Sequence, residues 1–151
     1  MAQYNINDIA NWFLTKENMS HKKLQKLCYY AVAWGYALLN RAICLNDEFQ
    51  AWVHGSVSPT LYEKYKGSGW IELTPEDDYK DSFDNVTTEL LESVWLTYGE
   101  QTGNSLEALT HSESPWIKAR GSCGQEDRCT TPINVKDMKD YYISIYMGGD
   151  A

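Results

Sequence analysis

Long hydrophobic runs and targeting signals are missing from this sequence of 151 residues. No stretch approaches the roughly 18 consecutive apolar residues that a membrane-spanning helix requires. The N-terminal segment, residues 1–10 (MAQYNINDIA), lacks the basic segment and following apolar stretch of a secretory signal peptide. We therefore expect a protein that stays in the cytoplasm and has no membrane partner, and whose four cysteines remain thiols.

Positive charge is also scarce. The 13 lysines and arginines are outnumbered by 21 aspartates and glutamates, so that the net charge is -8. Because binding to nucleic acid requires cations clustered on one face, this balance argues against a nucleic-acid partner. The one basic cluster is interpreted as the solvated start of a helix, and it comprises His21, Lys22, Lys23 and Lys26.

Catalytic motifs are absent as well. His21, His54 and His111 do not form a pair at helical spacing, which excludes a zinc site of the HExxH type. The chain has no GxSxG nucleophile elbow and no glycine-rich phosphate-binding loop followed by Lys-Ser or Lys-Thr. We therefore expect no catalytic residue, no metal and no cofactor, and thus a protein that is not an enzyme.

Two remaining groups of polar side chains are interpreted in the same way. Cys123 and Cys129 are too far apart for the usual zinc spacing, and we expect free thiols in a loop. The carboxylates of residues 76–84 have no apolar setting that would separate their pKa values, so they indicate a solvated acidic loop. A metal site that combines the two cysteines with His54 or His111 remains the alternative.

Helical periodicity is the main positive signal. Apolar residues recur every three or four positions over residues 6–16, which predicts an amphipathic helix. Residues 21–40 are apolar on nearly every side, which is typical of a buried central helix, with Cys28 in the core. Ser20 is expected to cap the start of that helix.

Shorter signals complete the predicted fold. Further helices are predicted over residues 59–66, 85–98 and 105–110, a short turn at 114–115, and a last helix after the cap Asn134. One strand is predicted over 69–75, and residues 47–55 form an extended stretch or a marginal strand. The fold class is therefore mainly α: one compact domain, residues 1–151, with five to seven helices around a central apolar helix and at most a small two-stranded β element.

Two stretches are more specific than composition. The first is LQKLCYYAVAWGYALLN (24–40) followed by FQAWVHGSVSPTLYEKYK (49–66), and the second is LTHSESPW (109–116). Together with VWLTYG (94–99), they resemble the Panacea domain, also called the SocA-like antitoxin domain, a family that includes phage-associated GepA-like proteins. The resemblance runs from about Ile6 to Tyr146. The chain departs from the family pattern G-P-V-x-P at Ser56, which stands where proline is usual and restores an N–H donor.

The resemblance implies a binding role. It implies an antitoxin that neutralises a co-encoded toxin by direct contact, and an adaptor that presents the toxin to a ClpXP-type protease. It also implies a phage or prophage origin, and we expect the extra DNA-binding domain of some relatives to be absent. The partner would then be a protein toxin from a neighbouring gene.

Aromatic residues around a turn suggest where that partner would bind, because tyrosine and tryptophan are enriched at the energetic centres of interfaces. The alternative is that the tryptophans and His111 only pack and cap the core. The candidate protein-binding residues are Trp52, His54, Gly55, Ser56, Pro59, Tyr62, Tyr65, His111 and Trp116.

Two other functions remain open at this stage. One is an acidic phage or mobile-element protein that binds and inhibits a host nucleic-acid-binding factor by charge mimicry. The other is a small metal-dependent hydrolase that uses His54, His111 and the aspartate-rich loop.

Overall fold

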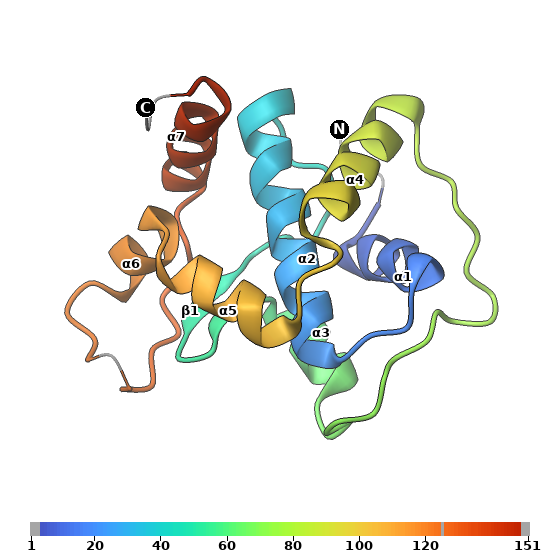
Figure 1. The fold of residues 1–151 in the computed structure, drawn as a ribbon, viewed down its shortest axis with the longest axis horizontal. Helices are drawn as coiled ribbons and strands as arrows, with labels where there is room; N and C mark the ends of the chain where they lie inside the picture. Colours follow the sequence, from blue (N-terminus) through green and yellow to red (C-terminus); the bar gives the residue numbers. More distant parts are fainter. Residues whose placement is uncertain (1–3, 125, 149–151) are drawn as a thin grey trace.

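A computed structural model describes residues 4–124 and 126–148. Seven α-helices and one two-stranded antiparallel sheet account for the described part (Figure 1), which confirms the predicted mainly α fold. In chain order the elements are α1 (Ile6–Lys16), α2 (His21–Trp34), the π-helical turn η1 (Gly35–Leu39), β1 (Gln50–Trp52), β2 (Gly55–Val57), α3 (Pro59–Tyr65), α4 (Asn85–Tyr98), α5 (Gly103–His111), α6 (Ser114–Arg120) and α7 (Val135–Tyr146).

Helix α2 runs through the middle of the molecule (Figure 1), as its apolar sequence predicts. It packs against α1, α4, α5, α7 and β2, and every residue from 23 to 33 is buried. A helix enclosed on all sides has no face for solvent, so apolar side chains occur on most of its circumference, and the polar Lys23, Gln25 and Lys26 are buried with them. The same enclosure explains why Cys28 lies in the core.

Side-chain caps fix where the helices begin. Ser20 Oγ accepts from the backbone N–H of Lys23 at 3.2 Å, and Asn134 caps α7 in the same way. Ser58 caps α3, whose first residue is Pro59, the position where proline costs no hydrogen bond. The caps Ser20 and Asn134 were predicted from the sequence. The helix predicted over 105–110 extends to both sides, and the turn predicted at 114–115 begins the complete helix α6.

The strand predicted over residues 69–75 is wrong. Leu73 exchanges two backbone hydrogen bonds with Met19, at 2.7 and 3.3 Å, and no described neighbour extends this bridge into a ladder. Trp70 and Ile71 are 96% and 70% exposed, whereas a strand packed on the core buries one of two successive side chains. Residues 69–75 cross the surface between α3 and the acidic loop, residues 76–84. Their run of apolar side chains therefore does not indicate a strand.

A buried carboxyl group connects α6 to the two helices behind it. Glu113, which precedes α6, accepts hydrogen bonds from the hydroxyl groups of Tyr30 and Tyr142, both at 2.8 Å. The hydroxyl oxygens of Tyr142 and Tyr29 also lie within hydrogen-bond distance, 3.1 Å apart, and the Tyr30 ring stacks on Tyr98 with centroids 4.0 Å apart. The aromatic side chains of the core thus surround the buried carboxyl group of Glu113.

Titration of Glu113 should make the fold less stable as pH rises. Burial raises the pKa of Glu113 above its ordinary value, although the two tyrosine hydroxyls partly oppose this. For a raised pKa, the stabilisation is present below the unfolded-state pKa and is lost as pH rises through the folded-state pKa. Glu113→Gln keeps an acceptor oxygen without titrating, so its melting temperature relative to the parent should increase between pH 4 and pH 8. The exposed Glu89→Gln is the control for loss of one charge, and parallel pH curves for Glu113→Gln and the parent would contradict the prediction.

Candidate protein-binding site

The β1–β2 hairpin positions the first candidate residues. Trp52 pairs with Gly55, and the tight turn consists of Val53 and His54, so the glycine and Ser56 lie in strand β2 instead of forming the predicted turn. A two-residue turn carries its side chains away from the sheet, and His54 is accordingly exposed. The hairpin therefore presents Trp52 and His54 together at one edge of the molecule.

Trp52 and Tyr62 form what we call the aromatic ridge. Their rings make an edge-to-face contact with centroids 4.8 Å apart, which joins the hairpin to helix α3. Both residues, together with His54, line two separate clefts, so the ridge divides them. A partner that fills either cleft must contact the ridge.

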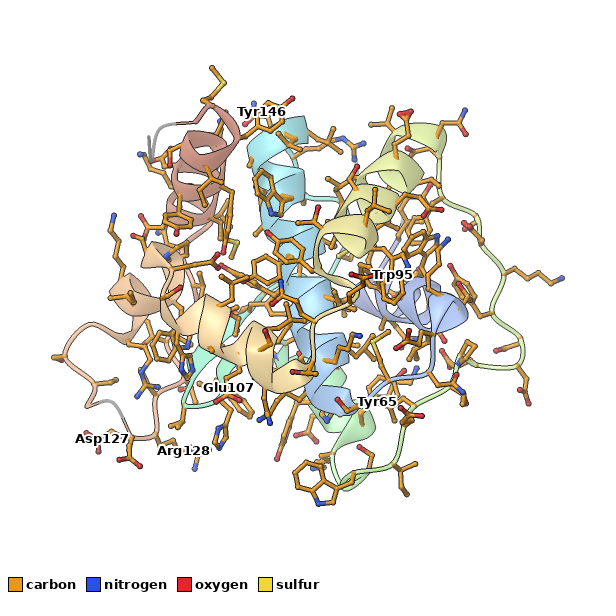
Figure 2. The ribbon with its side chains drawn as sticks, viewed as in Figure 1. Tyr65, Trp95, Glu107, Asp127, Arg128 and Tyr146 are labelled. Carbon is orange, nitrogen blue, oxygen red and sulfur yellow. The ribbon has the colours of Figure 1, made fainter. Side chains whose placement is uncertain are left out.

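One opening, which we call the loop cleft, has a volume of about 460 Å3 and lies toward the segment after α6. Figure 2 shows Arg128, one of its lining residues, on that segment. The other opening, which we call the α2–α5 cleft, has a volume of about 390 Å3. Its lining residues are Ser20, His21, Lys22, Gln25, Lys26, Trp52, His54, Val57, Tyr62, Gly69, Trp70, Thr102, Gly103 and Asn104.

His111 and Trp116 support the hairpin from behind. Their rings stack with centroids 4.1 Å apart, and the Trp116 indole N–H donates to the Trp52 carbonyl oxygen at 2.9 Å. Arg120 donates to the carbonyl oxygen of Ala51 at 3.0 Å. Because Trp116 is buried, its place in the site is to hold Trp52 in position.

The other predicted residues differ in exposure. Gly55 and Ser56 are buried, Pro59 is half-buried, and Tyr62 is exposed. Tyr65 is half-buried one turn after Tyr62, and burial raises its pKa to about 12. The structure thus brings Trp52, His54 and Tyr62 to the surface and places Gly55, Ser56 and Trp116 beneath it.

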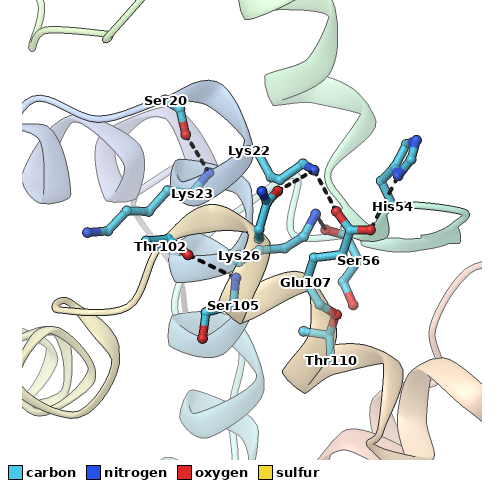
Figure 3. A network of polar contacts seen from close by, with 11 residues as sticks. Ser20, Lys22, Lys23, Lys26, His54, Ser56, Thr102, Ser105, Glu107 and Thr110 are labelled. Atoms are coloured by element: carbon cyan, nitrogen blue, oxygen red, sulfur yellow. Dashed lines mark hydrogen bonds and ion pairs between the residues drawn. The ribbon is translucent and has the colours of Figure 1, made fainter. Parts of the chain in front are cut away.

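Two residues of the basic cluster at the start of α2 are buried, contrary to the prediction, whereas His21 and Lys22 are partly exposed. Lys23 is buried and donates to the Gly99 carbonyl oxygen at 2.6 Å, at the end of α4. Lys26 is 1% exposed, and its amino group donates to the Ser56 carbonyl oxygen at 3.3 Å (Figure 3). Burial lowers the pKa of Lys26 to about 7, although the charge of Glu107 opposes this shift. The enclosed surface of α2 was the signal that these lysines would be covered.

An ion cluster joins α5 to the hairpin and to α2 (Figure 3). Glu107 lies 2.7 Å from the Lys22 ammonium and 3.3 Å from Nδ1 of His54. Burial alone would raise the pKa of Glu107, but its contacts with Lys22 and His54 outweigh that effect and lower it. Sequence reasoning missed Glu107, because its partners are distant along the chain.

The described part of the chain offers no ready metal site. No set of three His, Cys, Asp or Glu side chains there is arranged to hold an ion, and Cys28, Cys44, Cys123 and Cys129 are free. No described helix is both long enough and apolar enough to cross a bilayer.

Comparison with known proteins identifies the family of this chain. The family model described as antitoxin SocA-like, Panacea domain, matches residues 24–117, which run from α2 into α6. The chain belongs to the Panacea family of SocA-like antitoxin domains. The match covers a shorter part of the chain than the resemblance predicted. No curated protein and no solved structure matches the chain.

Three of the four segments that carry the Panacea resemblance meet at Gly55. An ideal Cβ on Gly55 would lie 2.7 Å from Cε of Lys26 and 3.0 Å from Oγ1 of Thr110. Gly55 of segment 49–66 is therefore in close contact with Lys26 of segment 24–40 and with Thr110 of segment 109–116.

Restoring the usual proline of the Panacea pattern at Ser56 should be tolerated. Ser56 pairs with Ala51, whose N–H donates to Thr131 and whose carbonyl oxygen accepts from Arg120. The Ala51–Ser56 pair is thus a non-hydrogen-bonded one, where proline removes no ladder bond. Ser56→Pro should change the free energy of unfolding by less than about 1 kcal/mol in denaturant titrations. A loss of about 3 kcal/mol, the effect of proline at a bonded position, would contradict this.

Proposed function

We propose that this Panacea domain neutralises a co-encoded protein toxin by direct contact, with the aromatic ridge at the centre of the interface. The supporting observation is that Trp52 and Tyr62, joined edge to face, divide two clefts on the surface of a domain from an antitoxin family. Aromatic side chains that flank pockets are typical of interface hot spots. The net charge of -8 would favour a basic toxin surface around this centre.

Co-expression tests the proposal. The neighbouring open reading frame is expressed alone and together with this chain, and growth is measured. We expect the frame to be toxic alone and harmless together, and the two proteins to copurify. A frame that is harmless alone, or that stays toxic beside the folded chain, would exclude the proposed function.

The proposal includes an adaptor role toward a ClpXP-type protease. If the chain delivers the toxin for degradation, the toxin half-life should fall several-fold when both chain and protease are present. The measurement is a chase of toxin levels after synthesis is stopped, in cells with and without the protease. If the toxin half-life is unchanged although the toxin is fully neutralised, the chain inhibits the toxin by binding alone and has no adaptor role.

A further inference from the structure

Lys26 is a buried amino group with spare hydrogen-bond donors in the wall of the α2–α5 cleft. A lysine ammonium has three N–H donors, and among the described residues this one hydrogen-bonds to the Ser56 carbonyl oxygen, at 3.3 Å. Removing an ammonium from water costs several kcal/mol unless charges or acceptors compensate. Lys26 therefore retains donor capacity beside a cavity.

His21 supplies a second donor to the same cleft. The side chain of Gln25 is fixed by two hydrogen bonds to the backbone of Ser58, at 2.8 and 3.2 Å, so its amide nitrogen faces Nε2 of His21 at 3.1 Å. Nε2 must accept from that amide, and the proton of a neutral ring is then on Nδ1. Burial and the charge of Lys26 lower the pKa of His21 and so favour this neutral form. No described residue accepts from that Nδ1–H.

The charge of the cleft is opposite to that of the chain. Among its described lining residues there is no aspartate or glutamate, although the chain contains 21 of them. Glu107, which pairs with Lys22 and His54, is not part of the lining. An anionic group that enters the cleft would meet donors and no acidic side chain.

The walls of the cleft are apolar. Trp52, Tyr62 and Val57 face it from the hairpin and α3, and the exposed Trp70 completes the wall after α3. A volume of about 390 Å3 is within the range of small-ligand pockets, with room for one side chain and a neighbouring anionic group. The lining thus suits an apolar group with one negative charge beside it.

We propose that the α2–α5 cleft binds a carboxylate next to an apolar side chain of the partner polypeptide, with Lys26 and His21 holding the carboxylate. The inference rests on the proposed function, because it names the group by which the partner is anchored. The aromatic ridge packs on the apolar side chain. The carboxylate comes from a chain terminus or from an acidic side chain, and the experiment separates these two sources.

Small probes test the cleft on the intact 15N-labelled chain by NMR titration. N-acetyl-leucine carries a terminal carboxylate, acetyl-Leu-Glu-amide carries a side-chain carboxylate, and N-acetyl-leucinamide is the neutral control. We expect the carboxylates to bind at least five-fold more tightly than the neutral amide and to shift the signals of Lys26 and Gly103. The tighter carboxylate identifies the source. Equal binding of the neutral amide, or stronger binding of inorganic phosphate at the same signals, would overturn the inference.

Two variants make the test specific. Lys26→Met removes the ammonium, and His21→Phe keeps a ring against Tyr62 and Tyr65 without the donor. Each should lose at least five-fold in carboxylate affinity, whereas the exposed Lys118→Gln on α6 should lose nothing. Melting curves identify any variant that fails to fold, and a folded variant of either residue with full affinity refutes the assignment. Carboxylate binding without toxin binding would refute the proposed function alone, and toxin binding without carboxylate binding would refute the cleft alone.

Discussion

Replacing Tyr62 by alanine should weaken toxin binding by at least about 30-fold, which corresponds to the roughly 2 kcal/mol that defines an interface hot spot. Tyr62 is exposed, lines both clefts and packs edge to face on Trp52. Its loss would merge the two clefts and leave Trp52 unsupported on one side. Titration calorimetry with the purified toxin measures the effect.

The same variant should remain folded. Tyr62 contributes exposed surface instead of core, so we expect its melting temperature to fall by a few degrees at most. Leu96→Ala is the matched control, because Leu96 is 85% exposed on α4 and lines neither cleft. Affinity retained in Tyr62→Ala would remove the ridge from the interface, and equal losses in both variants would indicate a general effect on folding.

The helices could be predicted because their signals are local. Apolar periodicity gave the bounds of α1 and α4, the caps Ser20 and Asn134 marked the starts of α2 and α7, and the largely apolar circumference of α2 identified it as central. These features depend on residues within a few turns of one another. Trp70 and Ile71 were misassigned because a short apolar run does not reveal whether a partner strand exists.

The site was only partly predictable, for the opposite reason. Trp52, His54 and Tyr62 could be named because they cluster within residues 49–66. The contact of Lys26 with the Ser56 carbonyl and the pairing of Glu107 with His54 join residues far apart in the chain. Charge composition assigned Lys26 to solvent, whereas the enclosure of α2 required the reverse. Where the charge of a side chain and the enclosure of its helix predict different environments, the enclosure determines whether the side chain is buried.

Gly55→Ala should destabilise the fold by about 3 kcal/mol, which lowers the melting temperature by roughly 6–12 °C. The backbone φ of +104° at Gly55 is one that side chains rarely adopt. The added methyl group would also lie 2.7 Å from Cε of Lys26 and 3.0 Å from Oγ1 of Thr110. Both neighbours are buried, so relief requires a shift of the hairpin or of the lysine.

Gly67→Ala separates the two contributions. Gly67 has a φ of +88°, but a Cβ there would have no neighbour within 4 Å. Gly67→Ala should therefore lose only the stability that corresponds to backbone strain, about 1 kcal/mol. Differential scanning calorimetry of both variants measures the losses. The excess loss in Gly55→Ala measures how closely Lys26 and Thr110 enclose Gly55. Equal melting temperatures for the two variants would mean that the motifs do not meet at this point.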